Sequence, residues 1–514
     1  MKLPIGIQDF ESLRKDGYLY IDKTEQVYRL ALEGRYYFLS RPRRFGKSLL
    51  ISTLKALFLG KRELFKGLAI DSKDDWEWAV HPVLHLDLNT NKYDKPEVLT
   101  QKLDESLNEW ETLYDCARPD LPLGMRFEKV IKAACEKTGQ RVVILVDEYD
   151  KPMLQAIGNR QLQDDYRGTL KGFYGALKSM DGCIKFAMLT GVTKFGKVSV
   201  FSDLNNLEDI SMLRRYYDVC GISEEELFSY FDQQIDVLAE ANDLTRAECI
   251  EKLRKMYDGY HFHQNAKGVY NPFSLLNTFK SLEFGSYWFE TGTPTYLVEL
   301  LRRHHYSLEE MATSEVTADV LNSIDAESHD PIPVIYQSGY LTIKGYKERF
   351  GKYILGFPNQ EVEKGFVQYL APFYLSKRES RSAFDVEKFA DDVETGQPDR
   401  FCKRLQTLLA SAPYDAEMSR EGNYQNVVWV VFKMMGFYTE AEYKTSDGRI
   451  DLLIETPDYR YVIEFKLDGT AEEALQQIKD KQYTLPYELD DKKTFMIGIN
   501  FSDTTRTIEK WVVE

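Results

Sequence analysis

The chain has 514 residues, enough for several domains, and its 43% hydrophobic and 13% aromatic content is ample for buried cores. The formal net charge of −16 excludes a protein that coats nucleic acid non-specifically, but leaves room for an enzyme that meets nucleic acid in one local groove. The six scattered cysteines include no CxxC pair, which argues against a zinc site or a disulfide framework. Without a long apolar run or the apolar core of a signal peptide, the sequence predicts a cytoplasmic protein with no membrane partner.

The first chemical motif lies within residues 35–60, which we expect to form a strand, a basic loop and a helix. Residues 36–39 are aromatic and apolar, as in a buried strand, and apolar residues recur at helical spacing after the loop. The loop ends in Gly46-Lys47-Ser48, a pattern in which backbone N–H groups wrap phosphates, the lysine reaches the terminal phosphates and the serine hydroxyl binds Mg²⁺. Arg41 stands where the general pattern has its first glycine, and a basic turn before an ordinary helix is the alternative. We predict that the phosphate-binding loop consists of Arg41, Pro42, Arg43, Arg44, Phe45, Gly46, Lys47 and Ser48.

The second motif is a β-branched strand, residues 141–146, that ends in two carboxylates. Phosphoryl transfer to water needs such a pair, with Asp147 holding Mg²⁺ through water and Glu148 polarising the attacking water. A later strand ends at Thr190, which we expect to contact the γ-phosphate or the attacking water, with Thr193 as the alternative. A strand followed by a helix cap, and a threonine in a turn, are the purely structural explanations.

The order of these segments predicts the architecture. Strands alternate with helices through residues 1–220, which favours a parallel sheet covered on both faces, with its ligands at the carboxyl ends of the strands. Residues 221–375 carry helical patterns with two capping boxes and a small β ribbon at 335–357, so we expect a helical adaptor or lid there. Residues 376–412 are expected to form a linker helix before a C-terminal domain at 413–514.

The C-terminal region carries the third motif, a predicted hairpin of two apolar strands. Asp451 lies on the first strand, and Glu464 and Lys466 lie two apart on the second, so the latter two share a face. Metal-assisted phosphodiester cleavage needs such a set: Asp451 and Glu464 hold a divalent ion, and Lys466 orients the water or stabilises negative charge. Glu421 is expected to bind a second ion or a ligand water. A charged hairpin face with a Glu–Lys pair is the alternative.

Taken together, these motifs resemble the bacterial AAA-ATPase-like family. The resemblance rests on Tyr20-Ile21-Asp22-Lys23-Thr24, Arg41-Pro42-Arg43-Arg44-Phe45-Gly46-Lys47-Ser48, Val146-Asp147-Glu148-Tyr149-Asp150-Lys151-Pro152, Thr190-Gly191-Val192-Thr193-Lys194-Phe195, Ser199-Val200-Phe201-Ser202-Asp203-Leu204-Asn205-Asn206-Leu207 and Tyr257-Asp258-Gly259-Tyr260. In that family this arginine-containing loop replaces the glycine-started one. The C-terminal Gly448-Arg449-Ile450-Asp451 and Glu464-Phe465-Lys466 are similar to the PD-(D/E)XK nuclease superfamily domain that such proteins carry.

The resemblance implies an α/β protein: a P-loop NTPase core of the additional-strand type with a parallel sheet, a helical adaptor, and a restriction-endonuclease-like α/β domain. In the nuclease superfamily a glutamine on the following helix often lies near the site, with a tyrosine four residues later. Here Tyr483 follows Gln477 by six residues, which is a departure from that pattern.

We therefore expect an ATP-binding protein that uses Mg²⁺, hydrolyses ATP, and thereby controls a C-terminal Mg²⁺-dependent nuclease or nuclease-fold DNA-binding domain. The alternative is a non-catalytic ATP-gated switch or scaffold whose C-terminal domain mediates binding only, which the acidic net charge favours. ATP and DNA are the expected partners. Because many P-loop ATPases form rings, a homo-oligomer is a further expectation, although no arginine finger stands out in the sequence.

Overall fold

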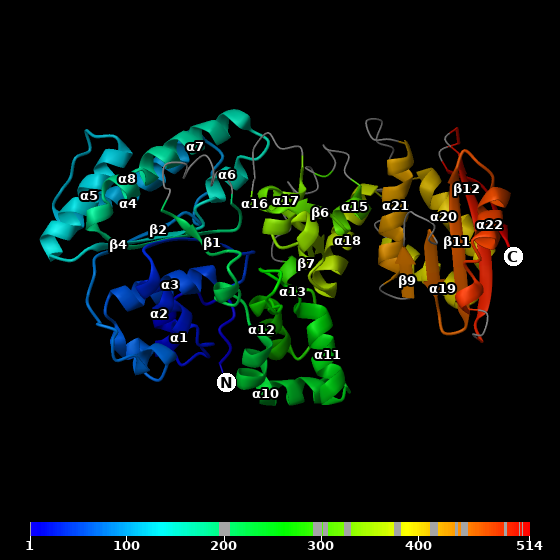
Figure 1. Ribbon diagram of the computed structural model, residues 1–514, viewed down its shortest axis with the longest axis horizontal. Coiled ribbons are helices and arrows are strands. Elements are labelled where there is room, and N and C mark those ends of the chain that lie inside the picture. The colour runs from blue at the N-terminus through cyan, green and yellow to red at the C-terminus, as the bar shows by residue number, and fades with distance from the viewer. Residues whose placement is uncertain are drawn as a thin grey trace. The chain divides into compact units, whose positions relative to one another are not determined.

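A computed structural model describes residues 2–194, 206–290, 301, 307–322, 330–374, 382–411, 420–436, 440–443, 451–487, 491–502, 504–505 and 507–514 (Figure 1). The chain packs into two compact units. The first comprises Met1–Leu297 and Thr313–Val362, and the second comprises Val298–Ala312 and Glu363–Glu514.

The first unit contains a sheet of five parallel strands in the order β2-β3-β4-β1-β5. The strands are β1 (Tyr36–Ser40), β2 (Val83–Asp87), β3 (Val142–Asp147), β4 (Ile184–Gly191) and β5 (Glu208–Asp209). Every residue of β1 and β3 is buried, as expected for parallel strands covered on both faces. Because β4 lies between β1 and β3, the sheet is of the additional-strand type, and the predicted fold class is confirmed.

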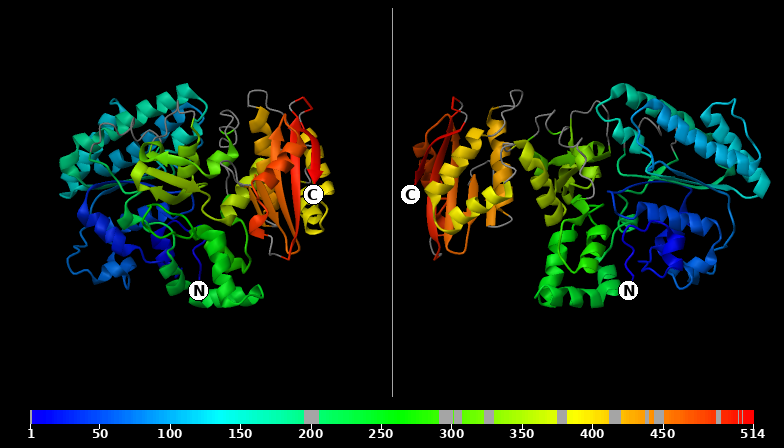
Figure 2. Two further views of the ribbon diagram at one scale, coloured as in Figure 1. Left: turned by 45° about the vertical axis from the view of Figure 1, so that its right-hand side comes forward. Right: turned by 180° about the vertical axis from the view of Figure 1, so that it is seen from behind.

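Helices cover both faces of this sheet (Figures 1 and 2). One face carries α1 (Phe10–Lys15), α2 (Thr24–Glu33) and α3 (Lys47–Phe58). The other face carries α4 (Pro96–Tyr114), α5 (Leu123–Thr138), α7 (Arg160–Tyr174) and α8 (Ala176–Ser179), with the short α6 (Lys151–Gln155) directly after β3. Stacked rings of Phe127 and Phe173, 4.4 Å apart, join α5 to α7.

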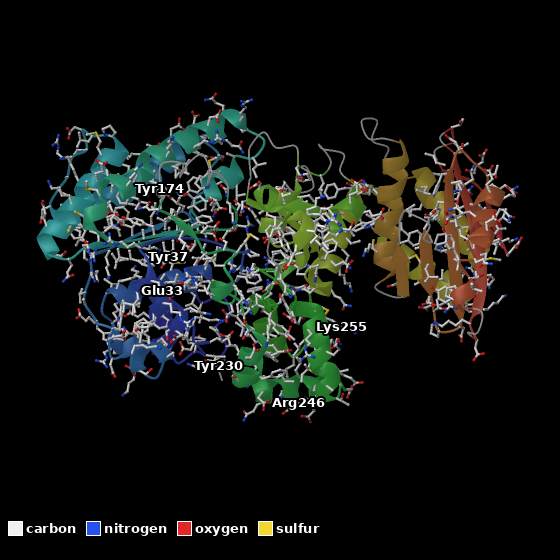
Figure 3. The ribbon with its side chains drawn as sticks, in the orientation of Figure 1. Glu33, Tyr37, Tyr174, Tyr230, Arg246 and Lys255 are labelled. Carbon is white, nitrogen blue, oxygen red and sulfur yellow. The ribbon has the colours of Figure 1, made fainter. Side chains whose placement is uncertain are left out.

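The same unit continues into a helical region with α10 (Glu224–Ala241), α11 (Arg246–Tyr257), α12 (Pro272–Ser281) and α13 (Tyr287–Glu290). Both predicted capping boxes are present, at the starts of α10 and α11. Figure 3 labels Tyr230 on α10, and Arg246 and Lys255 on α11. Apolar side chains near the N-terminus, from Leu3, Ile5, Leu19 and Ile21, pack against the core of these helices. The helical region and the parallel sheet therefore belong to one packed body.

A small antiparallel sheet, in the order β6-β8-β7, follows the helices of this region. It consists of β6 (Glu315–Thr317), β7 (Thr342–Lys347) and β8 (Lys352–Gly356), with α16 (Ala318–Asn322) and α17 (Ile332–Gln337) nearby in sequence. The predicted ribbon is wrong at its start, because residues 335–337 belong to α17. Pro331 and Pro333 preset helical φ at this position, and Asp330 accepts a hydrogen bond from the Ile332 N–H, so a helix forms despite the β-branched residues.

The second unit holds a mixed sheet in the order β13-β12-β11-β10-β9. Its strands are β9 (Glu440–Tyr443), β10 (Leu452–Glu455), β11 (Tyr459–Leu467), β12 (Lys493–Ser502) and β13 (Thr507–Val513). The predicted hairpin is present as antiparallel β10 and β11, and β11 pairs in parallel with β12 through the crossover helix α22 (Ala471–Asp480). The other helices are α15 (Leu308–Ala312), α18 (Gln360–Tyr374), which begins in the first unit, α19 (Ser382–Glu394), α20 (Pro398–Ser411) and α21 (Arg420–Met435). A single linker helix was predicted at 376–412, and the structure has the two helices α19 and α20 in that stretch.

Candidate nucleotide and metal sites

The predicted phosphate loop connects the carboxyl end of β1 to the first turn of α3. Gly46 is the N-cap of α3 with φ 96°, a left-handed conformation that glycine adopts without steric cost. No side chain caps this helix, so the first N–H groups of α3 are left for a ligand. Gly46, Lys47 and Ser48 all line a cavity of about 520 Å³. A helix N-terminus open to a cavity of this size is suited to an anion.

Lys47, the first residue of α3, places its ammonium group near the carboxyl edge of the sheet. Its side chain is buried, and its Nζ donates to the carbonyl oxygens of Arg41 at 3.0 Å and Pro42 at 3.3 Å. The same ammonium forms an ion pair with Glu148, 3.2 Å from Oε1. The structure therefore brings the loop lysine and the expected water-polarising carboxylate into direct contact.

The expected metal carboxylate and the expected sensor threonine also meet. Thr190 Oγ1 donates to Asp147 Oδ1 at 2.6 Å, and both side chains are buried. The contact follows from sheet order, because β3 and β4 are parallel neighbours with Val146 opposite Leu189. Glu148, the next residue, adopts φ 53°, which turns the chain away from the strand. Sequence spacing alone could not show that strands about forty residues apart pair side by side.

Asp150, which lies in one of the family motifs but was assigned no role from sequence, organises the segment after β4. Its carboxylate accepts hydrogen bonds from the Val192 N–H at 3.2 Å and from the Thr193 N–H and Oγ1, each at 2.6 Å. Burial, with a contribution from the charge of Glu148, raises the pKa of Asp150 from 3.8 to about 6. Thr193, the alternative to Thr190, is thus engaged by Asp150, whereas Thr190 is engaged by Asp147.

The second candidate site lies on the hairpin of the C-terminal unit. Asp451 directly precedes β10, and its Oδ2 accepts a hydrogen bond from the Phe465 N–H at 2.9 Å. Glu464, on β11, is buried, and its Oε2 has no hydrogen-bond partner among the residues that the structure describes. Burial, with the nearby charge of Asp451, raises the pKa of Glu464 to about 7, and burial also raises the pKa of Asp451. Two neighbouring, desolvated carboxyl groups with a free oxygen fit a hard divalent cation.

Gln477, on α22, forms hydrogen bonds with both Glu464 and Lys466. Its Nε2 donates to Glu464 Oε1, and its Oε1 accepts from Lys466 Nζ. Tyr483 is buried nearby, and burial followed by the charge of Glu464 raises the pKa of its hydroxyl. The six-residue spacing arises because α22 ends at Asp480 and residues 481–484 form turns, so a helical count between Gln477 and Tyr483 does not apply.

The comparisons with known proteins cover both sites. Residues 4–201 match the family described as "Predicted AAA-ATPase", and residues 419–511 match the "PD-(D/E)XK nuclease superfamily". A protein of Azotobacter chroococcum mcd 1, "Uncharacterized protein in vnfD 5'region", is 36% identical over 534 aligned residues, which include 100% of this chain and 99% of the relative. The chain belongs to the predicted AAA-ATPase family with a C-terminal PD-(D/E)XK nuclease superfamily domain.

In this AAA-ATPase family member, the phosphate loop divides into two parts. Residues 43–48 line the cavity together with Glu148, whereas Arg41, Pro42, Asp147 and Thr190 are not among its lining residues. The buried Arg41 guanidinium donates to the carbonyl oxygens of Ser211 at 2.6 Å and Tyr216 at 3.0 Å. Arg41, in the place of the first glycine, therefore stabilises the loop by binding these carbonyl groups and does not line the cavity.

In the PD-(D/E)XK nuclease superfamily domain, two of the three predicted metal ligands can be placed. Asp451 and Glu464 lie together, while the side chain of Glu421, in the first turn of α21, falls outside the described residues. Within the described ranges, no group of three or more His, Cys, Asp or Glu side chains gathers. No helix in the described part of the chain is long and apolar enough to span a bilayer.

Proposed function

We propose that the first unit binds ATP with Mg²⁺ and hydrolyses it. The observation that carries this proposal is the convergence of Lys47, Glu148 and the Asp147–Thr190 pair at the carboxyl edge of one parallel sheet. Lys47 and the open N–H groups of α3 bind the phosphate oxygens. Ser48 and Asp147 would hold Mg²⁺, which neutralises phosphate charge when bound.

Glu148 and Thr190 serve the hydrolytic step in this proposal. Without nucleotide, the Glu148 carboxylate is paired with Lys47, 3.2 Å away. Nucleotide phosphates compete for that ammonium, and the released carboxylate accepts a proton from the attacking water. Thr190 orients the water or the γ-phosphate from the end of the neighbouring strand.

The experiment is isothermal titration of ATP with Mg²⁺ into wild type and Lys47→Ala. The variant should lose measurable binding, because the cation at the phosphate site is gone. Lys55→Ala is the matched control, since Lys55 lies on the exposed side of the same helix and does not line the cavity. Unchanged ATP affinity and turnover in Lys47→Ala would overturn the assignment of the loop.

We propose a second function, metal-dependent cleavage of DNA, for the C-terminal domain. In the described part of the chain, the buried Glu464 Oε2 has no hydrogen-bond partner and lies beside Asp451 and a lysine held by Gln477, which supports this function. Asp451 and Glu464 would hold the ion, which activates water and neutralises phosphate charge when bound. Lys466 stabilises the negative charge that develops on the phosphate. We also propose that the nucleotide bound to the first unit controls the access of DNA to this site.

Incubation of duplex and single-stranded DNA with wild type and Glu464→Gln, in Mg²⁺ or Mn²⁺, tests this second function. Cleavage should occur with wild type and vanish in Glu464→Gln, whereas the exposed Glu472→Gln should cleave normally. If wild type binds DNA but cleaves none with either ion, the domain is a binding module, as in a non-catalytic ATP-gated switch. Light scattering with and without ATP tests the expected homo-oligomer.

A further inference from the structure

The phosphate loop is held from outside by residues that follow the parallel sheet in sequence. The indole Nε1 of Trp288 donates to the Arg43 carbonyl at 2.9 Å. The Gly221 N–H donates to the Phe45 carbonyl at 3.2 Å. A methyl group placed on Gly339 would lie only 2.6 Å from the Pro42 side chain, so the backbone there packs directly on the loop. Three segments outside the parallel sheet, at Gly221, Trp288 and Gly339, thus contact the loop.

The loop needs such support because of its own sequence. Arg41 takes the place of the first glycine, and Arg44 adopts φ 67°, a left-handed conformation that is unfavourable for a non-glycine residue. A conformation of this kind persists only where the surroundings determine it. The guanidinium of Arg44 lies over the ring of Phe273, 4.8 Å from its centre, so the contact comes again from the helical region.

Trp288 is itself fixed on two sides. Its backbone N–H donates to Glu361 Oε1 at 2.7 Å, and Glu361 is fully buried and also accepts from Ser274 Oγ at 2.9 Å. The Trp288 ring packs edge-on against the Tyr340 ring, with centroids 5.3 Å apart. The indole is thus a rigid donor aimed at a loop carbonyl, and it also lines the cavity that Lys47 and Ser48 line.

We propose that Trp288 is a positioning residue for the phosphate loop, and that the helical region thereby completes the nucleotide site of the parallel sheet. This inference rests on the proposed ATP binding. The Trp288 indole keeps the Arg43 carbonyl turned outward, which leaves the N–H groups of residues 44–48 directed at the phosphates. Nucleotide affinity then depends in part on a hydrogen bond donated from outside the sheet.

The test compares full-length wild type, Trp288→Phe and Trp110→Phe by titration calorimetry with ATP and ADP, and by thermal unfolding without ligand. Trp288→Phe keeps an aromatic ring but removes the N–H donor, whereas Trp110 on α4 lies away from the cavity. One lost hydrogen bond corresponds to roughly a five- to tenfold weaker nucleotide affinity. We expect that loss in Trp288→Phe only, with unfolding temperatures of the two variants alike.

Tryptophan fluorescence gives a second readout, which reports whether bound nucleotide lies beside Trp288. ATP should change the emission of wild type and of Trp110→Phe, and the change should be absent in Trp288→Phe. If Trp288→Phe fails to fold, Glu361→Gln, which weakens the anchor of the Trp288 backbone, should lower nucleotide affinity severalfold. Wild-type affinity in a folded Trp288→Phe variant would overturn this inference alone, whereas a wild type that binds neither nucleotide would overturn the proposed function as well.

Discussion

At the scale of single residues, Asp150 is a buried carboxyl group in the first unit whose charged form is disfavoured by burial. It is fully buried, and its three hydrogen-bond donors only partly offset the loss of solvent, so its pKa is raised to about 6. These donors all belong to Val192 and Thr193, directly after the strand that bears Thr190. The protonation of one carboxyl group is therefore linked to the segment beside the proposed hydrolytic site.

This raised pKa predicts that the stability contributed by Asp150 falls with increasing pH. Below pH 3.8 the carboxyl group is protonated in both the folded and the unfolded chain, so its contribution is fully present. Between pH 3.8 and about 6 the unfolded chain releases its proton first, and the folded state loses roughly 2–3 kcal/mol. Scanning calorimetry from pH 4 to 7 should show wild type losing stability relative to Asp150→Asn. A constant difference between the two proteins over this range would contradict the prediction.

The residue types of the sites were predictable from sequence, but their contacts were not. The Lys47, Asp147 and Glu148 motifs are local patterns, and the structure brings Lys47 into contact with Glu148, the residue after Asp147. Arg41 was expected to bind nucleotide. Its guanidinium instead donates hydrogen bonds to the carbonyl oxygens of Ser211 and Tyr216, about 170 residues later in the chain. Gln477, whose orientation could not be predicted from sequence, lies between Glu464 and Lys466. Such pairings depend on tertiary packing, which a single sequence does not encode in any local spacing.

At the scale of elements, one glycine sets how closely the crossover helix of the C-terminal domain approaches its sheet. A methyl group on Gly498, in β12, would lie 2.1 Å from the carbonyl oxygen of Ala471 and 2.6 Å from the Leu475 nitrogen, both in α22. These neighbours are backbone atoms of a helix, so they cannot move aside without shifting α22 as a whole. That helix carries Gln477, which holds Glu464 and Lys466.

Gly498→Ala should therefore destabilise the second unit by about 2 kcal/mol or more, since overpacking against backbone commonly costs 1–3 kcal/mol. It should also impair DNA cleavage if the fold survives, because α22 would move Gln477. Gly168→Ala on α7 is the control, since a methyl group there meets nothing within 4 Å. Equal thermal stability of the two variants would show that α22 does not pack on β12 as described.

Most elements were predictable because their periodicity is strong, and the failures have local causes. Alternation of buried strands with amphipathic helices indicated the parallel sheet, and the structure confirms it. Periodicity does not predict the order of the strands in the sheet, because that order depends on which strands pair across long connections. The ribbon predicted to start at residue 335 failed because prolines at 331 and 333 start a helix there. In that short segment, proline geometry overrides the strand preference of isoleucine and valine.

At the scale of the whole molecule, the chain consists of two compact units, and the two family matches fall in different units. The similarity to the Azotobacter chroococcum protein runs through both units, because it covers 100% of this chain. The first unit contains the whole cavity, including its walls from the helical region. Ligands of the two proposed sites should therefore stabilise different parts of the chain.

Scanning calorimetry with each ligand tests this separation. ADP with Mg²⁺ at a hundred times its Kd adds about 2.7 kcal/mol to the stability of the state that binds it. For a unit of this size, that should raise one unfolding transition by roughly 3–4 °C and leave the other unchanged. Lys47→Ala should abolish the shift. A shift of both transitions, or of neither, would contradict the assignment of nucleotide to the first unit.

The ion pair between Lys47 and Glu148 has a consequence for which anions this protein can accept. The Lys47 ammonium has a carboxylate and two carbonyl oxygens as neighbours. An incoming anion must therefore compete with the Glu148 carboxylate, which is held close to Lys47 by the same chain. In the proposed ATP complex, the phosphates would contact the start of α3 while the rest of the nucleotide would contact apolar and aromatic side chains of the same cavity, such as Phe273 and Trp288. A sulfate or orthophosphate ion can make only the first of these contacts. We therefore expect such small anions to compete with Glu148 for Lys47 less well than ATP does.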